Sequence, residues 1–227
     1  GGDALAVARL LIQSGYDVAT YLINPSGKLS ADCAINKKRL SDLTEVKFTE
    51  INTQFEPPVL TEQTIVVDGL FGTGLHNVLS GGFAALVKFI NASPAQVVSI
   101  DMPSGLMAED NSANVRAHII RANYTFTFQL PQLSLLLADT QCFVGELKVL
   151  DIGLSASAIE AMETKYEMAG EDFIHTLLMS RDNFGHKGTF GHALLVSGKF
   201  GMAGAAILGA KSCLRCGAGK VTIHTPH

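Results

Sequence analysis

The chain has 227 residues and a formal net charge of −4, and 47% of its residues are hydrophobic against 17% charged. This balance excludes global disorder, because a chain this apolar can bury enough surface to fold. Lysines and arginines are scattered apart from Lys37–Arg39, so we expect no nucleic-acid partner. No apolar run approaches the roughly 18 residues of a membrane span, so we also expect no membrane partner.

The first two thirds of the chain alternate between helix and strand patterns. Apolar residues at helical spacing predict helices over 3–14, 30–43 and 81–91, and short apolar runs predict strands over 17–22, 46–48, 64–68, 96–101, 124–128 and 146–152. The β-branched run at 64–68 is of the kind that parallel sheets bury on both faces. Strands that alternate with helices predict an α/β fold with a doubly wound parallel sheet.

The composition changes after Leu154. Residues 155–179 are more polar, with helical spacing and no strand pattern, so we predict a partly helical connection. Beyond it, glycine becomes frequent again, and the patterns predict a strand over 193–196, a helix over 203–216 and a strand over 220–225.

These changes divide the chain. We expect a first domain over 1–155, a linker over 156–180 and the beginning of a second domain over 181–227. The chain opens at Gly1 without a methionine and directly before a helical pattern, so we expect it to be a piece of a longer chain. The four cysteines form no disulfide pattern, and reduced thiols favour the cytoplasm. For the pair Cys213 and Cys216, packed thiols are favoured over a zinc or redox site.

The chain begins with Gly1-Gly2-Asp3, immediately before the first predicted helix. Glycines at this place leave backbone N–H groups open to an anion at the positive end of a helix dipole. Asp3 is a candidate to accept hydrogen bonds from a ribose, and an N-cap role is an equally good reading. A full G-x-G-x-x-G is absent from this segment, so an ordinary Rossmann dehydrogenase gains no support.

Two further candidates lie where buried strands end. Asp68 closes one strand before a loop with three glycines, and Asp101 closes the next before Pro103, Ser104 and Gly105. The carboxyl ends of parallel strands are where open α/β sheets bind ligands. A carboxylate there can act as a general acid or base, and its oxygens with a hydroxyl suit a hard cation. The alternative for each residue is loop capping, and the pair together favours function.

These segments resemble the signature blocks of NAD(P)H-hydrate epimerase, in the same order. The blocks are Gly1-Gly2-Asp3, the segment 67–75, the segment 99–105, the strand 124–128 and the segments 145–147 and 151–153. The similarity covers about residues 1–155. It implies a Rossmann-like homodimer or higher homo-oligomer with a bound potassium ion. The implied activity converts the S form of hydrated NADH or NADPH to the R form.

The same resemblance implies roles for single residues. Asp68 and Ser104 are expected to ligate potassium, with an asparagine ligand upstream of Gly1. Asp101 is expected to face the substrate as the catalytic acid or base. The residues expected to contact the hydrated dinucleotide are Gly2, Asp3, Gly72, Thr73, Gly74, Leu75, His76, Asn77, Val78 and Asp101. Gln132 departs from the family, which often has lysine there.

The C-terminal part resembles the opening of ADP- or ATP-dependent NAD(P)H-hydrate dehydratase. The resemblance rests on segments 186–191, 195–199, 202–206 and 214–219. It implies the beginning of a ribokinase-like α/β domain that uses ADP or ATP with magnesium to dehydrate the S form. Ala205 is expected to lie against the hydrated substrate. His186 and Lys187 either face the substrate or cap the strand, and neither role is assigned. Lys199 departs from the family, which often has serine there.

The order of the two resemblances predicts a bifunctional enzyme that repairs hydrated nicotinamide cofactors. Two alternatives remain. The glycine-rich second part also fits a ribokinase-like small-molecule kinase, and the first part also fits a nucleotide-binding module without catalysis. Substrate tests on sugars against hydrated NADH would identify the kinase, and epimerisation of the purified S-form hydrate separates the enzyme from the binding module.

Overall fold

The computed structural model describes residues 1–44, 46–178 and 180–225. The chain forms two compact units, Gly1–Met162 and Glu163–His227. The domain limits expected from the sequence, at 155 and 181, stay a prediction. Met179 in the expected connection and residues 226–227 of the expected second domain lie outside the described residues.

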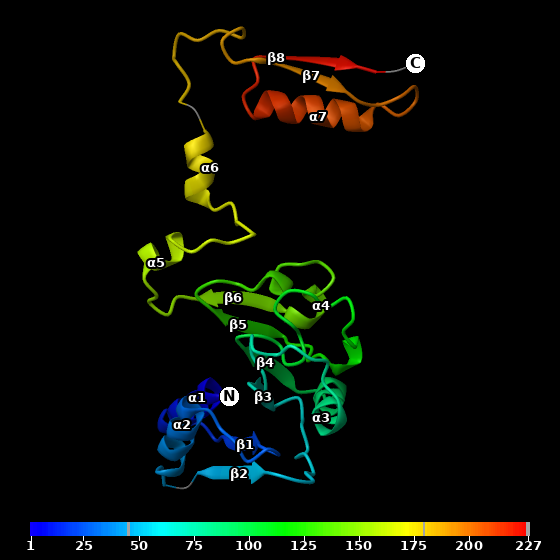
Figure 1. Cartoon of the computed structure of the whole chain (residues 1–227). Helices are drawn as coiled ribbons and strands as arrows, with labels where there is room; N and C mark the ends of the chain where they lie inside the picture. The colour runs from blue at the N-terminus through cyan, green and yellow to red at the C-terminus, as the bar shows by residue number, and fades with distance from the viewer. Residues whose placement is uncertain (45, 179, 226–227) are drawn as a thin grey trace. The chain divides into compact units, whose positions relative to one another are not determined.

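The first unit alternates helices with strands, as the periodicity predicts (Figure 1). Its strands are β1 (Ala19–Ile23), β2 (Lys47–Ile51), β3 (Ile65–Asp68), β4 (Gln96–Ile100), β5 (Tyr124–Phe128) and β6 (Glu146–Leu150). Its helices are α1 (Gly2–Gln13), α2 (Ala31–Ser41), α3 (Gly81–Ala92), α4 (Gln141–Val144) and α5 (Ala156–Glu160), with short 3₁₀ turns η1 (Arg116–His118) and η2 (Leu133–Leu135).

Every strand pair in this unit is parallel, which confirms the predicted α/β class with parallel strands. The strands form two sheets, a pair β1-β2 and a four-stranded sheet in the order β3-β4-β5-β6. The sequence predicts one continuous sheet, and the described residues differ because β1 and β3 do not hydrogen-bond to each other. The predicted α/β class with parallel strands is therefore confirmed, whereas the single sheet that the sequence predicts is divided into two sheets in the structure.

Strand β3 is less buried than its composition predicts. The side chains of Ile65 and Val67 are 61% and 38% exposed, whereas Asp68 is buried. Residues 65 and 67 share one face because side chains alternate along a strand. The expectation that this strand is buried on both faces is therefore wrong, because the face that carries Ile65 and Val67 is left partly uncovered.

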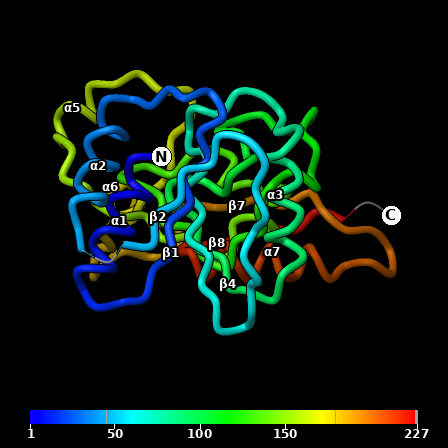
Figure 2. The backbone as a smooth tube through the Cα atoms, turned by 90° about the horizontal axis from the view of Figure 1, so that it is seen from below, coloured from blue at the N-terminus to red at the C-terminus, as the bar shows by residue number. Residues whose placement is uncertain are grey.

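Three apolar clusters hold the first unit together. One joins α1, α2 and β1 through Leu5, Leu22 and Leu40. Helices α1 and α2 lie side by side in both views of the chain (Figures 1 and 2). A second cluster packs α3 on β4 through Val87 and Val97. The third surrounds Met102 and lies directly beneath the loop that follows β4, so the core supports the carboxyl ends of the strands.

The second unit contains α6 (Glu171–Leu177), β7 (His192–Val196), α7 (Gly204–Arg215) and β8 (Lys220–His224). Strands β7 and β8 are parallel, and α7 connects them and packs against both. Ala206 of α7 is buried, and Gly209 brings the helix close to Leu195. The strand, helix and strand predicted beyond residue 190 are thus present. Among the described residues of the whole chain, each helix is too short or too polar to cross a lipid bilayer.

Candidate functional site

The candidate site lies where β3 and β4 end. The two strands are parallel neighbours, and their register pairs Asp68 with Ser99. The chain leaves β3 into the glycine loop 69–78 and leaves β4 into the loop 101–105, so both loops emerge at the same edge of the sheet. The sequence-predicted Asp68, Asp101 and Ser104 are thereby brought together.

Asp68 is a buried carboxylate with a full set of neutral donors. Its Oδ2 accepts hydrogen bonds from the Ser99 hydroxyl and the Ser104 amide, both at 2.8 Å. Its Oδ1 accepts from the Ser104 hydroxyl at 2.5 Å and from the Leu70 amide at 3.4 Å. Burial raises the pKa of this carboxyl above its ordinary value, and the hydrogen bonds oppose that rise. No ion pair of Asp68 occurs within the described part of the chain.

Ser104 connects the two loops. Its hydroxyl donates to Asp68, accepts the amide of Phe71 at 3.0 Å and lies 3.3 Å from the Phe71 carbonyl oxygen. A single side chain from the second loop therefore holds both the buried carboxylate and the backbone of the first loop. This contact explains why a serine, with one donor and two acceptor lone pairs, serves at this position.

Asp101 is held in an unusual backbone conformation. Its φ is 68°, in the left-handed region that residues with a Cβ seldom adopt. Its amide donates to the Phe126 carbonyl at 2.7 Å, and its carboxylate Oδ2 accepts the Thr73 amide at 3.0 Å. A Cβ on Gly72 would lie only 2.6 Å from that oxygen, so any side chain at this position would displace the Asp101 carboxylate. The half-buried carboxylate is thus aimed along the glycine loop.

The beginning of α1 adjoins the same loops. The backbone nitrogen of Gly1 donates to the Gly69 carbonyl, and a Cβ on Gly69 would lie 2.5 Å from the Cβ of Ala4. Among the described residues no side chain caps α1, and Asp3 lies within its first turn with its side chain exposed. The alternative that Asp3 is the N-cap is therefore wrong, because the helix begins one residue earlier, at Gly2. The helix start leaves its first N–H groups without a side-chain partner.

The remaining loop residues border solvent. Thr73, Gly74, His76 and Asn77 are exposed, whereas Gly72, Leu75 and Val78 are partly buried. The Leu75 amide closes a turn on the Gly72 carbonyl at 3.2 Å. Of the predicted contact residues, Gly72 and Thr73 adjoin Asp101, and the rest of the loop continues from them as a partly exposed rim.

The second unit carries three further residues that the sequence singles out. Ala205 lies exposed in the first turn of α7. The ring Nδ1 of His186 accepts the Gly188 amide at 3.0 Å, a contact within the loop that precedes β7, and the choice between a substrate-facing and a strand-capping role stays a prediction. The backbone at Lys187 passes so close to Gly219 that a Cβ there would lie 2.0 Å from the Lys187 carbonyl oxygen.

Sequence reasoning misses three groups at the site. Ser99 donates to Asp68, and the backbone amides of Phe71 and Thr73 bind Ser104 and Asp101. The contact of Ser99 with Asp68 could be predicted only from the register of the two strands, which places Ser99 opposite Asp68. The two amides carry no signal in the residue type, since every residue except proline has one.

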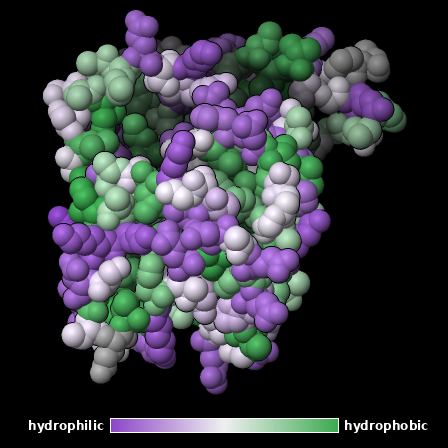
Figure 3. Space-filling view, turned by 60° about the horizontal axis from the view of Figure 1, so that its bottom comes forward, coloured by the Kyte–Doolittle hydropathy of each residue, from purple (hydrophilic) through white to green (hydrophobic). Residues whose placement is uncertain are grey.

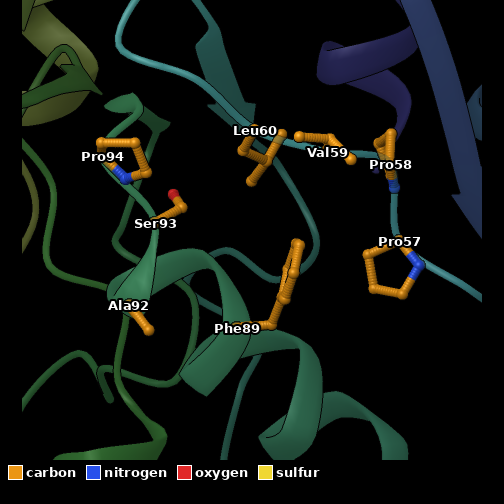
Figure 4. A pocket seen from close by; sticks show the side chains of 8 residues that line it. All are labelled: Pro57, Pro58, Val59, Leu60, Phe89, Ala92, Ser93 and Pro94. Atoms are coloured by element: carbon orange, nitrogen blue, oxygen red, sulfur yellow. The ribbon is translucent and has the colours of Figure 1, made fainter.

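Two apolar hollows lie elsewhere on the first unit. One, of about 280 Å³, is formed by residues 57–60 and the end of α3, with Phe89 facing Leu60 across it (Figure 4). A second, of about 470 Å³, adjoins it and shares Pro57 and Phe89. No titratable side chain lines either hollow. The chemistry-bearing groups are therefore those of the strand-end loops.

Comparison with known proteins gives concordant results. The family model described as YjeF-related protein N-terminus matches residues 1–134. The chain is 34% identical over 154 residues to the NAD(P)H-hydrate epimerase of Oenococcus oeni, which covers 68% of this chain and 70% of that protein.

Longer relatives match both units. The chain is 34% identical over 227 residues to the bifunctional NAD(P)H-hydrate repair enzyme Nnr of Coxiella burnetii, covering 99% of this chain and 45% of that protein. The protein of the same description from Escherichia coli is 32% identical over 228 residues, covering 99% of this chain and 42% of its own length. The chain thus spans less than half the length of these relatives.

Proposed function

Because this chain belongs to the YjeF-related N-terminal family and, within it, to the NAD(P)H-hydrate epimerases, we propose that its first unit interconverts the S and R forms of hydrated NADH and NADPH. The observation that carries the proposal is the conformation of Asp101. Asp101 is held in a rare backbone conformation with its carboxylate against the glycine loop, at the sheet edge where such folds bind ligands, and a carboxylate positioned there supports a role in acid–base catalysis.

The chemistry follows from the substrate. The carbon that bears the added hydroxyl is also bonded to the ring nitrogen. Asp101, in its acid form, donates a proton to that hydroxyl, the C–O bond breaks and water leaves. The nitrogen lone pair then forms the C=N bond of an iminium ion. Water adds to the opposite face and returns a proton to the Asp101 carboxylate, which inverts the centre and balances the reaction.

The substrate is proposed to lie along the rim between α1 and the glycine loop. Gly2 and Asp3 offer unpaired helix N–H groups and a carboxylate to the dinucleotide. Gly72–Val78, whose glycines carry no Cβ, allow the backbone to approach the ring closely. Their exposure beside Asp101 supports this assignment.

The test uses the full-length protein and purified S-form hydrate. Replacing Asp101→Ala is expected to lower the epimerisation rate by on the order of 100-fold or more, because acid–base catalysis contributes at least that much. The exposed Asp139→Ala is the matched control and is expected to leave the rate unchanged. The S and R forms are separated by chromatography over time.

Two outcomes would contradict the proposal. An Asp101→Ala protein that epimerises at the normal rate removes Asp101 from catalysis. A wild-type protein that never epimerises the hydrate removes the enzymatic function and leaves a binding module, and phosphorylation of a small alcohol by the intact protein would favour the kinase alternative.

We also propose that Asp68 and Ser104 hold a potassium ion. Four neutral donors leave the buried Asp68 charge uncompensated, and burying an unpaired charge is costly. The oxygens of Asp68, Ser104 and the Phe71 carbonyl meet within hydrogen-bonding distance, and such a hard donor set fits an alkali cation. When bound, the ion would neutralise the carboxylate and order the loop that carries the substrate contacts.

Replacing potassium with tetramethylammonium tests this assignment. The larger cation is expected to lower both the melting temperature and the affinity for the hydrate, because it does not fit between these oxygens. An Asp68→Asn protein is expected to melt at the same temperature in either salt. Equal melting of the wild-type protein in the two salts would contradict an ion at Asp68.

For the second unit we propose the beginning of a ribokinase-like dehydratase domain that uses ADP or ATP with magnesium. The match of the bifunctional Coxiella relative across both units supports this order of domains. Ala205, exposed at the start of α7, is accessible to a substrate as that role requires. We further propose a homodimer or higher homo-oligomer in the cytoplasm, which light scattering and cell fractionation of the full-length protein would test.

A further inference from the structure

The turn after β1 presents a free cation. Asn24 is buried, and its side-chain oxygen lies 3.4 Å from the hydroxyl of Ser26, which in turn accepts the Lys28 amide at 3.3 Å. Gly27, at φ 67°, closes the turn by donating its amide to the Asn24 carbonyl at 3.1 Å. The turn is therefore built from its own hydrogen bonds. The side chain of Lys28 is exposed and forms no ion pair with any described residue.

This turn lies at the same corner as the start of α1. A Cβ on Gly2 would lie 3.5 Å from the Cys33 amide nitrogen, in the first turn of α2. That amide donates to the hydroxyl of Ser30, which caps α2 directly after the turn. The first turn of α2, which directly follows the turn after β1, is therefore adjacent to Gly2, one of the proposed dinucleotide contacts.

A general rule connects these two places. In dinucleotide-binding α/β folds the pyrophosphate lies at the first helix start, and the residue that closes the next strand, about 20 residues on, contacts the adenosine ribose. An acidic residue there accepts from a 2′-hydroxyl, whereas a basic residue nearby accommodates a 2′-phosphate. In this chain the corresponding residue is Asn24, directly after β1.

The groups around Asn24 do not suit a ribose diol. Its amide donates to Glu50 at 3.0 Å, and Glu50 is paired with Lys37 at 2.5 Å. That carboxylate is therefore already occupied. The Lys28 ammonium is the group that has no ion pair among the described residues, and a cationic donor suits a phosphate. The Ser26 hydroxyl lies beside it, and its own contact with the Asn24 oxygen is long, at 3.4 Å. Asp32, in the first turn of α2, is the competing group for a ribose hydroxyl.

We propose that Ser26 and Lys28 bind the 2′-phosphate of hydrated NADPH, so that this protein prefers hydrated NADPH to hydrated NADH. The inference rests on the proposed function, because it assigns the substrate of that same site. Ser26 offers a hydroxyl within the turn and Lys28 supplies the charge. The preference concerns binding of the substrate only, because the hydrated nicotinamide ring on which Asp101 acts is the same in both hydrates.

The first experiment measures kcat/KM of the full-length protein for both S-form hydrates. Lys28→Glu is expected to lower the value for hydrated NADPH by on the order of tenfold, because it removes one charge-assisted contact and adds a repulsive charge. The value for hydrated NADH is expected to stay within about twofold, as expected where no contact is lost. Lys38→Glu makes the same charge change in the last turn of α2 and is expected to alter neither value.

The second experiment measures binding without catalysis. By calorimetry the wild-type protein is expected to bind adenosine 2′,5′-bisphosphate more tightly than adenosine 5′-monophosphate, and Lys28→Glu is expected to abolish that difference. Asp32→Asn is expected to leave the difference in place. If Asp32→Asn alone changes the preference, Asp32 contacts the ribose and the assignment to Lys28 is wrong.

The outcomes separate this inference from the proposed function. A wild-type protein that epimerises both hydrates, with a ratio that Lys28→Glu does not change, overturns the inference alone. A protein that epimerises neither hydrate overturns the proposed function, and the two adenosine phosphates then still decide whether Lys28 selects the 2′-phosphate.

Discussion

Asp101 has a strained backbone conformation, with a positive φ. A residue with a Cβ enters the left-handed region at a cost of roughly 1–2 kcal/mol, and glycine enters it freely. The contacts with Phe126 and Thr73 keep Asp101 there at φ 68°. The residue type therefore opposes the local backbone, which is expected where a side chain is kept for its chemistry.

A pair of substitutions measures this strain. Asp101→Gly and Asp101→Ala both remove the carboxylate and its hydrogen bond, and they differ only in their tolerance of positive φ. The glycine variant is expected to be more stable than the alanine variant by about 1 kcal/mol. Chemical denaturation monitored by circular dichroism gives the comparison. Equal stabilities would show that the backbone at this position is not strained.

Glu50 makes the stability of the protein depend on pH. The cause is hydrogen bonding, which lowers the pKa of a carboxyl, whereas burial raises it. Hydrogen bonds from Lys37 and then Asn24 lower the pKa of this carboxyl from its ordinary value of 4.5. A depressed pKa in the folded state stabilises the protein above the ordinary value, and the contribution is lost as the pH falls through the folded value.

Glu50→Gln is therefore expected to lower the melting temperature at neutral pH, and the difference from wild type is expected to shrink as the pH falls below the ordinary carboxyl pKa of 4.5 and then to vanish. Scanning fluorimetry across a pH series measures it. Glu62→Gln, at an exposed position, is the control and is expected to show no such dependence. A difference that stays constant with pH would mean that the charge of Glu50 contributes nothing.

At the scale of elements, periodicity predicts where strands and helices lie but does not predict their neighbours. The apolar run before Asp101 predicts β4 almost to the residue, because hydrophobic spacing is a local property. The same reasoning misjudges β3, whose Ile65 and Val67 remain exposed, because burial depends on what packs against that face of the sheet.

The candidate site is predictable to a similar extent. That Asp68 and Asp101 lie at one sheet edge follows from two parallel strands in succession. Their partners do not follow from it, because Ser99 reaches Asp68 through a register between strands 31 residues apart. Asp101's positive φ is equally invisible in the sequence, since it results from contacts that only the folded loops make.

At the scale of the whole molecule, β3 leaves an open edge. Its other side pairs with β4, and no strand pairs with the outer side among the described residues. The surface of one face is a mosaic in which apolar side chains interrupt the polar ones (Figure 3). An open edge next to exposed apolar side chains such as Ile65 and Val67 is a template for pairing with another chain.

Val67→Lys is therefore expected to reduce the formation of species larger than a dimer by this 227-residue chain, because a charge on the exposed face opposes edge pairing. Light scattering over a concentration series measures the effect. Val115→Lys, at a similarly exposed loop position, is the control. Loss of large species in both variants would attribute the effect to net charge instead of the edge.

The hydrogen bonds between the two strand-end loops have a further consequence, for exchange with solvent deuterium. The amides of Phe71 and Thr73 belong to the first loop, and their acceptors, Ser104 and Asp101, belong to the second. Each of these protons can exchange only after its hydrogen bond has opened. The exchange rates of the two amides therefore report how often these contacts between the loops break, and a ligand that holds the loops together is expected to slow both protons.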